Sequence, residues 1–95
     1  MAAYVIIDIE VTDRESLQAY QAQAGSIMER YGGKFIARGG AFEVVEGDWQ
    51  PHRLSIMEFE SAEKAMDFYN SPEYAAIRPI RHRAAHTRVI VVQGI

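Results

Sequence analysis

Arginine and glutamate occur in this sequence at positions where the two side chains could act together. Arg38 belongs to the run FIARGG and Glu58 to the run IMEFE, and both runs have the composition of strands. A guanidinium binds a carboxylate through two parallel hydrogen bonds, and a carboxylate can act as a general base. If the two runs form a hairpin, Arg38 and Glu58 face each other. They are then either a substrate-binding arginine with a catalytic glutamate, or a structural ion pair.

A second group of candidates carries hydroxyl groups and surrounds the motif FYNSPEY. In a cleft between helices and a sheet these hydroxyls would orient a small polar or aromatic ligand. We assign proton transfer to Tyr69 and Tyr74, and substrate binding to Tyr20 and Ser71. The alternative is structural: a serine before Pro-Glu caps a helix, and tyrosines pack in cores with their hydroxyls at the surface.

The third group is a basic cluster near the C-terminus, made of Arg78, Arg81, His82, Arg83, His86 and Arg88. We expect Arg81 to point into the cleft and bind an anion, and the alternative for the cluster as a set is a solvated helix face. Ten basic residues against thirteen acidic ones, and no RNA-binding sheet motif, argue against a nucleic-acid partner. His82 and His86 are four residues apart, but there is no HExxH motif and no third ligand for them, and His52 has no motif either. The sequence therefore predicts no metal and no cofactor.

The composition is that of one small domain covering residues 1–95, with 48% hydrophobic residues. The chain has no cysteine, which excludes disulfides and thiolate chemistry. It contains no run of roughly 20 apolar residues, and its start does not read as a signal peptide. We expect a cytoplasmic protein without a membrane partner.

The pattern of residues predicts four strands, at 3–11, 34–45, 53–60 and 87–92. The second strand contains Gly39-Gly40, where we expect a bulge or bend. Thr12 and Glu15 have the spacing of a capping box that starts a helix running to about Tyr31. Gly25, inside this helix, suggests either a close approach to a neighbouring element or a tolerated weakness of the helix.

Ser61 is predicted to cap a second helix, whose buried stripe is Ala62, Ala65, Met66 and Tyr69. Ser71 and Pro72 start another helical segment, in which Pro79 predicts an interruption. The order strand-helix-strand-strand-helix-strand is that of the α+β, ferredoxin-like βαββαβ fold, a four-stranded antiparallel sheet with helices on one face. The bare face would carry Tyr4, Ile6, Leu54 and Ile56, so the sequence predicts a homodimer that covers it.

Three segments resemble a known family: YGGKFIARGG, EGDWQPHRLSIMEFES and AMDFYNSPEYAAIRPIRHRAA. They are similar to the domain of unknown function 1330 family, within the dimeric α+β barrel superfamily. The resemblance implies that two sheets pair into a barrel, and it implies no established reaction. Relatives in the superfamily include cofactor-independent monooxygenases, haem-binding enzymes and muconolactone isomerase-like enzymes. The family pattern falls on Asp13, Tyr20, Gly33, Arg38, Gly39, Glu46, Gly47, Arg53, Glu58, Tyr69, Ser71, Tyr74 and Arg81.

Two functions follow as expectations. The first is a cofactor-independent enzyme acting on a small anionic or oxygenated organic molecule. The alternative is a non-catalytic dimeric module that binds a metabolite or has a structural role. An enclosed pocket lined by Tyr20, Tyr69, Tyr74 and Arg81 would favour the enzyme, and a filled core would favour the module.

Overall fold

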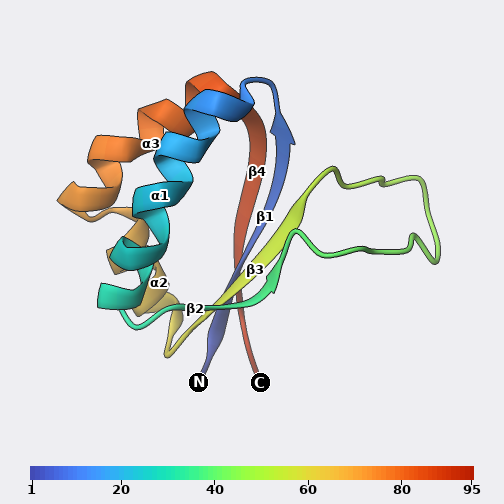
Figure 1. Ribbon diagram of the computed structural model, residues 1–95. Helices are drawn as coiled ribbons and strands as arrows, with labels where there is room; N and C mark the ends of the chain where they lie inside the picture. Colours follow the sequence, from blue (N-terminus) through green and yellow to red (C-terminus); the bar gives the residue numbers. More distant parts are fainter.

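The computed structural model describes residues 1–95 as a sheet covered on one face by three helices (Figure 1). The elements are β1 (Ala3–Val11), α1 (Arg14–Arg30), β2 (Lys34–Arg38), β3 (Leu54–Phe59), α2 (Ala62–Tyr69), α3 (Pro72–Ala84) and β4 (Ala85–Gln93). The strand order is β2-β3-β1-β4, and every neighbouring pair is antiparallel. This is the ferredoxin-like fold, and it confirms the prediction from the sequence.

The side chains of the central strand β1 alternate between the two faces of the sheet. Its residues Val5, Ile7 and Ile9 are buried beneath the helices, as alternation along a strand requires. Met57 and Phe59 on β3 lie on the same face and complete the sheet side of the core. Burying an apolar side chain of this size contributes roughly 1.5–3 kcal/mol, so this face dominates the stability of the fold.

The cap of α1 is Asp13, and the prediction of a Thr12 cap is wrong. The Asp13 carboxylate accepts hydrogen bonds from the Ser16 amide (3.1 Å) and from the Ser16 hydroxyl (2.7 Å). The amides of Thr12 and Asp13 both donate to the carbonyl of Ala84, at 2.8 and 2.9 Å. These contacts with the end of α3 keep the chain extended through Thr12, so the helix begins one residue later than the sequence pattern predicts.

The caps of α2 and α3 are confirmed as Ser61 and Ser71. The predicted stripe of α2 is wrong at Met66, whose side chain is 41% exposed, while Phe68 is buried instead. The predicted interruption at Pro79 is also wrong, because α3 is one helix with Pro79 inside it. A proline removes one backbone hydrogen bond, and the packing of α3 against α1 holds the helix together despite that loss.

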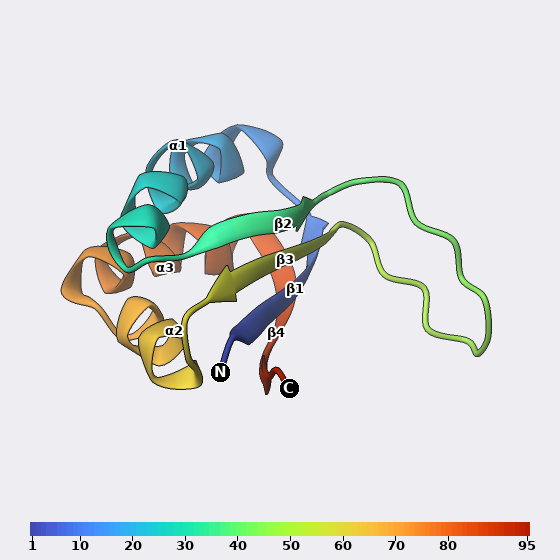
Figure 2. The same cartoon turned by 90° about the horizontal axis from the view of Figure 1, so that it is seen from below.

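The segment between β2 and β3 differs most from the prediction. β2 ends at Arg38, its register irregularity lies between Phe35 and Ala37, and residues 41–45 are not in a strand. Residues 39–53 form a long protrusion, called here the arm, which extends away from the helices in both views (Figures 1 and 2). Strand composition is therefore insufficient here, because no neighbouring strand in the same chain pairs with residues 41–45.

None of the three helices has the length and apolar character that a membrane span requires.

Candidate functional site

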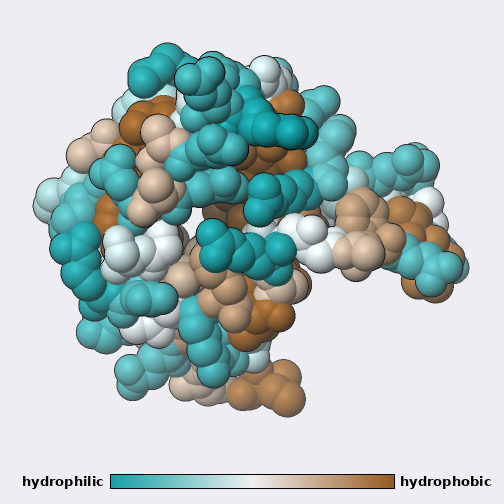
Figure 3. Space-filling view, in the orientation of Figure 1, coloured by the Kyte–Doolittle hydropathy of each residue, from teal (hydrophilic) through white to brown (hydrophobic).

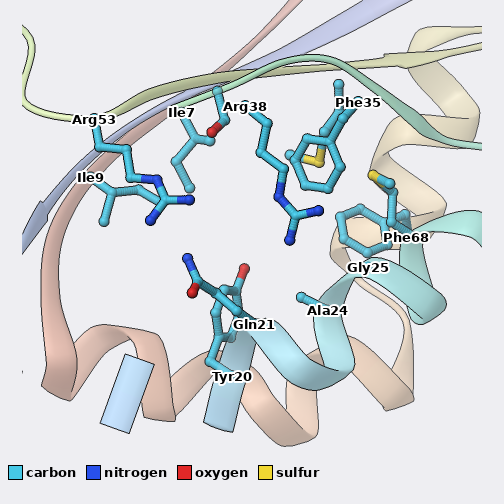
Figure 4. Close-up of a pocket in the computed structure, with 13 residues that line it drawn as sticks. Ile7, Ile9, Tyr20, Gln21, Ala24, Gly25, Phe35, Arg38, Arg53 and Phe68 are labelled. Atoms are coloured by element: carbon cyan, nitrogen blue, oxygen red, sulfur yellow. The ribbon is translucent and has the colours of Figure 1, made fainter. Parts of the chain in front are cut away.

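A cleft lies between α1 and the helix-covered face of the sheet (Figure 4). It contains about 530 Å³ of space free of atoms, including its opening to solvent. Strands β1, β2 and β3, helix α1, one side chain of α2 and the last residue of the arm supply its thirteen lining residues: Ile7, Ile9, Tyr20, Gln21, Ala24, Gly25, Met28, Phe35, Arg38, Arg53, Ser55, Met57 and Phe68. The walls are mainly apolar, and the polar groups are few, which is the usual character of a small-molecule site.

Two guanidinium groups provide the positive charge of the cleft. Arg38 is the last residue of β2, and Arg53 lies just before β3. The two arginines are therefore at the points where the arm leaves the sheet and returns to it. Figure 4 shows both side chains pointing into the cleft, opposite Gln21 on α1. Neither arginine forms an ion pair within the chain, and the Arg38 guanidinium lies 4.5 Å from the centre of the Phe35 ring. The pair therefore presents free donors beside an aromatic wall.

The backbone fixes Arg53 more firmly than its exposed neighbours in the arm. Its amide and carbonyl exchange hydrogen bonds with Ile9 on β1, at 3.1 and 2.8 Å. Its side chain passes over Gly39, which has a φ of +62°, and a Cβ on Gly39 would lie 2.6 Å from the Arg53 Nε. Glycine is needed at this position for both its backbone conformation and the space it leaves.

The predicted pairing of Arg38 with Glu58 is wrong. In the register of the hairpin, Arg38 lies opposite Ser55 and Glu58 lies opposite Lys34. Successive side chains on a strand alternate between faces, so Ser55 and Glu58 point to opposite sides of the sheet. Glu58 forms its ion pair with Lys34, at 3.3 Å, on the face without helices. It is outside the cleft that Arg38 lines.

The Tyr20 and Tyr74 hydroxyls form the hydrogen bond that joins α1 to α3. The two oxygen atoms are 2.5 Å apart and both side chains are buried. Burial raises the pKa of both phenols above its ordinary value of 10, while the nearby Arg81 charge opposes this shift. Both groups are therefore neutral hydrogen-bond donors near neutral pH. Tyr20 lines the cleft, and Tyr74 lies behind it.

Arg81 lies in the core next to this pair and does not line the cleft. It is 1% exposed, and its guanidinium carbon is 6.0 Å from the centre of the Tyr20 ring. Its Nη2 is 3.3 Å from the His82 Nε2, whereas its Nε and Nη1 are buried without a hydrogen-bond partner. The structure thus brings Arg81 to Tyr20 and separates it from the cleft by that ring.

Ser71 and Tyr69 have structural contacts in this chain. The Ser71 hydroxyl donates to the Phe68 carbonyl (2.8 Å) and accepts from the Tyr74 amide (3.1 Å), as expected for a cap. The Arg78 guanidinium lies 4.8 Å from the centre of the Tyr69 ring and donates to the Tyr69 carbonyl at 2.9 Å. Neither Ser71 nor Tyr69 lines the cleft.

Several residues of the cleft received no role from the sequence. Arg53 and Gln21 are its main additional polar groups, and Gly25 forms part of the α1 wall. A Cβ on Gly25 would meet no atom within 4 Å, which contradicts a close approach at this glycine and leaves the alternative, a tolerated weakness of the helix. The signal that could have revealed Arg53 is its position at the start of β3, beside the Ile7 and Ile9 face of β1.

The histidines do not assemble a common site. His82 is on α3 and His86 is on β4, so their spacing does not place them on one helix face. The His52 amide donates to the Asp8 carboxylate at 2.8 Å, and its Nε2 is 3.5 Å from a Glu10 oxygen. No three histidine, aspartate or glutamate side chains of the chain converge closely enough to hold a metal ion.

The chain belongs to the family described as domain of unknown function (DUF1330), whose model matches residues 2–95. This confirms the family suggested by the sequence motifs. No curated protein matches the chain.

Solved structures of low sequence identity have the same fold. RPA0582, a protein of unknown function from Rhodopseudomonas palustris, is 21% identical, with a TM-score of 0.77 over 99% of this chain and 82% of that one. SnoaB, a cofactor-independent oxygenase from Streptomyces nogalater, is 9% identical, with a TM-score of 0.71 over 99% and 93%. A dimeric ferredoxin-like protein of unknown function from Jannaschia is 8% identical, with a TM-score of 0.65 over 99% and 100%. At these identities the likeness concerns the fold.

Proposed function

We propose that this protein binds a small aromatic carboxylate in the cleft between α1 and the sheet. The observation that carries the proposal is the pair of guanidinium groups, Arg38 and Arg53, which line an apolar cleft and have no carboxylate partner in the chain. A carboxylate satisfies guanidinium donors in a charge-assisted, bidentate geometry. The ligand would supply the negative charge that the protein does not.

The walls of the cleft favour an apolar body on that carboxylate. Ile7, Ile9 and Met57 rise from the sheet, and Phe35 and Phe68 contribute aromatic surface. An aromatic ring packs well against such surfaces, and its burial adds the apolar part of the affinity. Gln21 faces the two arginines and can hydrogen-bond a second oxygen of the ligand.

The same lining favours binding over acid–base catalysis. It contains no aspartate, glutamate or histidine, so the protein supplies no evident general base at the cleft. Glu58, the base suggested by the sequence, lies on the other face of the sheet. The function that we propose first is therefore that of a non-catalytic metabolite-binding module.

We also infer that two copies associate through the sheet face without helices. Ile6, Ile56 and Ile90 are paired neighbours on β1, β3 and β4, so they form one apolar row across that face. Ile90 is 58% exposed in the single chain. Dimeric solved proteins of the same fold support this arrangement, and a second copy would remove the row from water.

Thermal-shift measurements with benzoate, salicylate and cinnamate, each compared with its uncharged amide, test the binding proposal. A ligand at 100 times its Kd stabilises by about 2.7 kcal/mol, a shift of several degrees for a small domain. We expect the carboxylates to raise the Tm and the amides to leave it unchanged. Arg38→Gln and Arg53→Gln should each abolish the shift.

Lys34→Gln is the matched control, because Lys34 shares β2 with Arg38 and points to the opposite face. It should bind carboxylates as the wild type does. Equal shifts for carboxylates and amides, or full binding by both arginine variants, would contradict the proposal.

A second candidate is a cofactor-independent enzyme, favoured by the Tyr20 phenol at the cleft wall. Its raised pKa keeps the hydroxyl protonated and able to donate a hydrogen bond, and Tyr74 and Arg81 adjoin it from behind. The fold shared with SnoaB is compatible with this role. Once a ligand is identified, Tyr20→Phe should bind it normally and lose any turnover. Turnover that survives this substitution would exclude a catalytic role for the Tyr20 hydroxyl.

A further inference from the structure

We propose that the arm, residues 39–53, of one copy packs on the second copy of this chain, with its acidic side chains against Arg88. The inference rests on the dimer inferred above and adds a second contact to it, outside the sheet face. It explains why a long protrusion with exposed apolar side chains belongs to so small a chain.

The backbone of the arm lacks partners within its own chain. Only the two ends of the arm are tied to the sheet, through Gly39, His52 and Arg53. Residues 40–51 make no backbone hydrogen bond with the rest of the chain. Their sequence nevertheless includes FEVV, a run with strand character. Unpaired strand-like backbone is a template for pairing with another chain.

The side chains of the arm indicate the same kind of partner. The exposed fractions of Phe42, Val44, Val45 and Trp49 are 46%, 41%, 91% and 54%. Figure 3 shows hydrophobic surface gathered on the protrusion, apart from the body of the molecule. Clustered apolar side chains of this kind mark an interaction surface more often than a solvated loop.

The direction of the arm favours a second copy as the occupant. Figures 1 and 2 show it leaving the sheet on the side away from the helices. This is the side that carries the apolar row of Ile6, Ile56 and Ile90. A two-fold axis between two sheets and along their strands places the β2–β3 edge of one copy opposite β4 of the other. The arm then reaches the end of β4 that carries Arg88, because Arg88, Asp8 and Leu54 are neighbours in the register beside the arm.

Charge complements this placement. Residues 39–52 of the arm contain Glu43, Glu46 and Asp48 and no lysine or arginine, so this part of the arm carries a charge of −3, equal to the net charge of the chain. Arg88 is exposed on the face without helices and has no ion pair in the chain. The acids of that face already have contacts, Glu58 with Lys34, and Asp8 and Glu10 with His52. Arg88 is thus the unpaired cation available to a partner's arm.

Charge reversal and mixing test the proposal, with sedimentation equilibrium as the readout on the full chain. One variant reverses the arm (Glu43→Lys, Glu46→Lys and Asp48→Lys), and the other is Arg88→Glu. Each alone should raise the dimer Kd at least about tenfold, because like charges then meet at both copies of the contact. An equimolar mixture should recover wild-type association, since both contacts in the heterodimer pair opposite charges.

Arg83→Glu is the matched control, because Arg83 is exposed on α3, outside the sheet face, and should leave the dimer unchanged. Circular dichroism establishes that all variants are folded. Variants that dimerise as tightly as the wild type, or a mixture no tighter than its components, would overturn the arm contact and leave the sheet-face dimer standing. A monomeric wild type would overturn both.

Discussion

At the scale of single residues, the cleft combines two kinds of polar group with different environments. Arg38 and Arg53 are accessible and unpaired, and they provide donors for an anion. Tyr20 and Tyr74 are buried and bonded to each other, and Arg81 is enclosed beside them. The arginine pair suits ligand binding, because neither guanidinium is held in an ion pair of the protein.

The phenol pair should make the fold sensitive to alkali. A raised pKa in the folded state means that the neutral form stabilises the fold below the ordinary value of 10, and that this stabilisation is lost as the pH rises above it. Difference absorbance between the wild type and Tyr20→Phe/Tyr74→Phe should show no phenolate from this pair until the chain unfolds. Ionisation of the pair at its ordinary pKa in the folded protein would contradict this.

Gly25 offers a direct test of the cleft. Alanine at an interior helix position is favoured over glycine by about 1 kcal/mol, and a Cβ there meets no atom, so Gly25→Ala should raise stability by about that amount in urea unfolding. Gly25→Leu should fill the cleft and weaken carboxylate binding. Ala22→Leu, on the exposed side of α1, is the control. Normal binding by Gly25→Leu would place the ligand elsewhere.

At the scale of elements, the caps set where each helix begins and therefore where its side chains point. Asp13 starts α1 so that Tyr20, Gln21 and Ala24 reach the cleft. Ser71 starts α3 so that Tyr74 meets Tyr20. The contact of both Thr12 and Asp13 with Ala84 links the start of α1 to the end of α3.

The Asp13 cap predicts a loss of stability in acid. Hydrogen bonds from the Ser16 side chain and backbone lower the pKa of Asp13 below its ordinary value of 3.8. Its contribution is therefore present above that value and is lost as the pH falls through the lower pKa of the folded state. In urea unfolding at several pH values, the advantage of the wild type over Asp13→Asn should shrink below about pH 4. Parallel pH curves for the two proteins would show that this carboxylate does not contribute.

At the scale of the whole molecule, the sheet divides the protein into two sides of different character. One side carries the helices and the cleft, and the other carries the Ile6, Ile56 and Ile90 row. The arm joins them, because Arg38 directly precedes it and Arg53 is its last residue, while its body extends beyond the opposite face. Docking of the arm on a second copy would therefore restrain the two arginines of the cleft.

The sequence by itself determined the order of the elements, the family and the caps at Ser61 and Ser71. These features depend on local signals: hydrophobic periodicity, serine before a helix, and glycine at turns. The assignment of Ile6 and Ile56 to the face without helices followed from the alternation along a strand. Such signals act over a few residues and can be read from the sequence directly.

The tertiary structure alone decided which polar residues meet. Whether Arg38 lies opposite Glu58 or Ser55 depends on the hairpin register. One irregularity in that register moves every later side chain of the strand to the other face of the sheet. The burial of Arg81, the joining of Tyr20 to Tyr74 and the unpaired state of residues 41–45 likewise depend on elements distant in the sequence. The cleft residues come from β1, α1, β2, the arm, β3 and α2, so only the packed molecule brings them together.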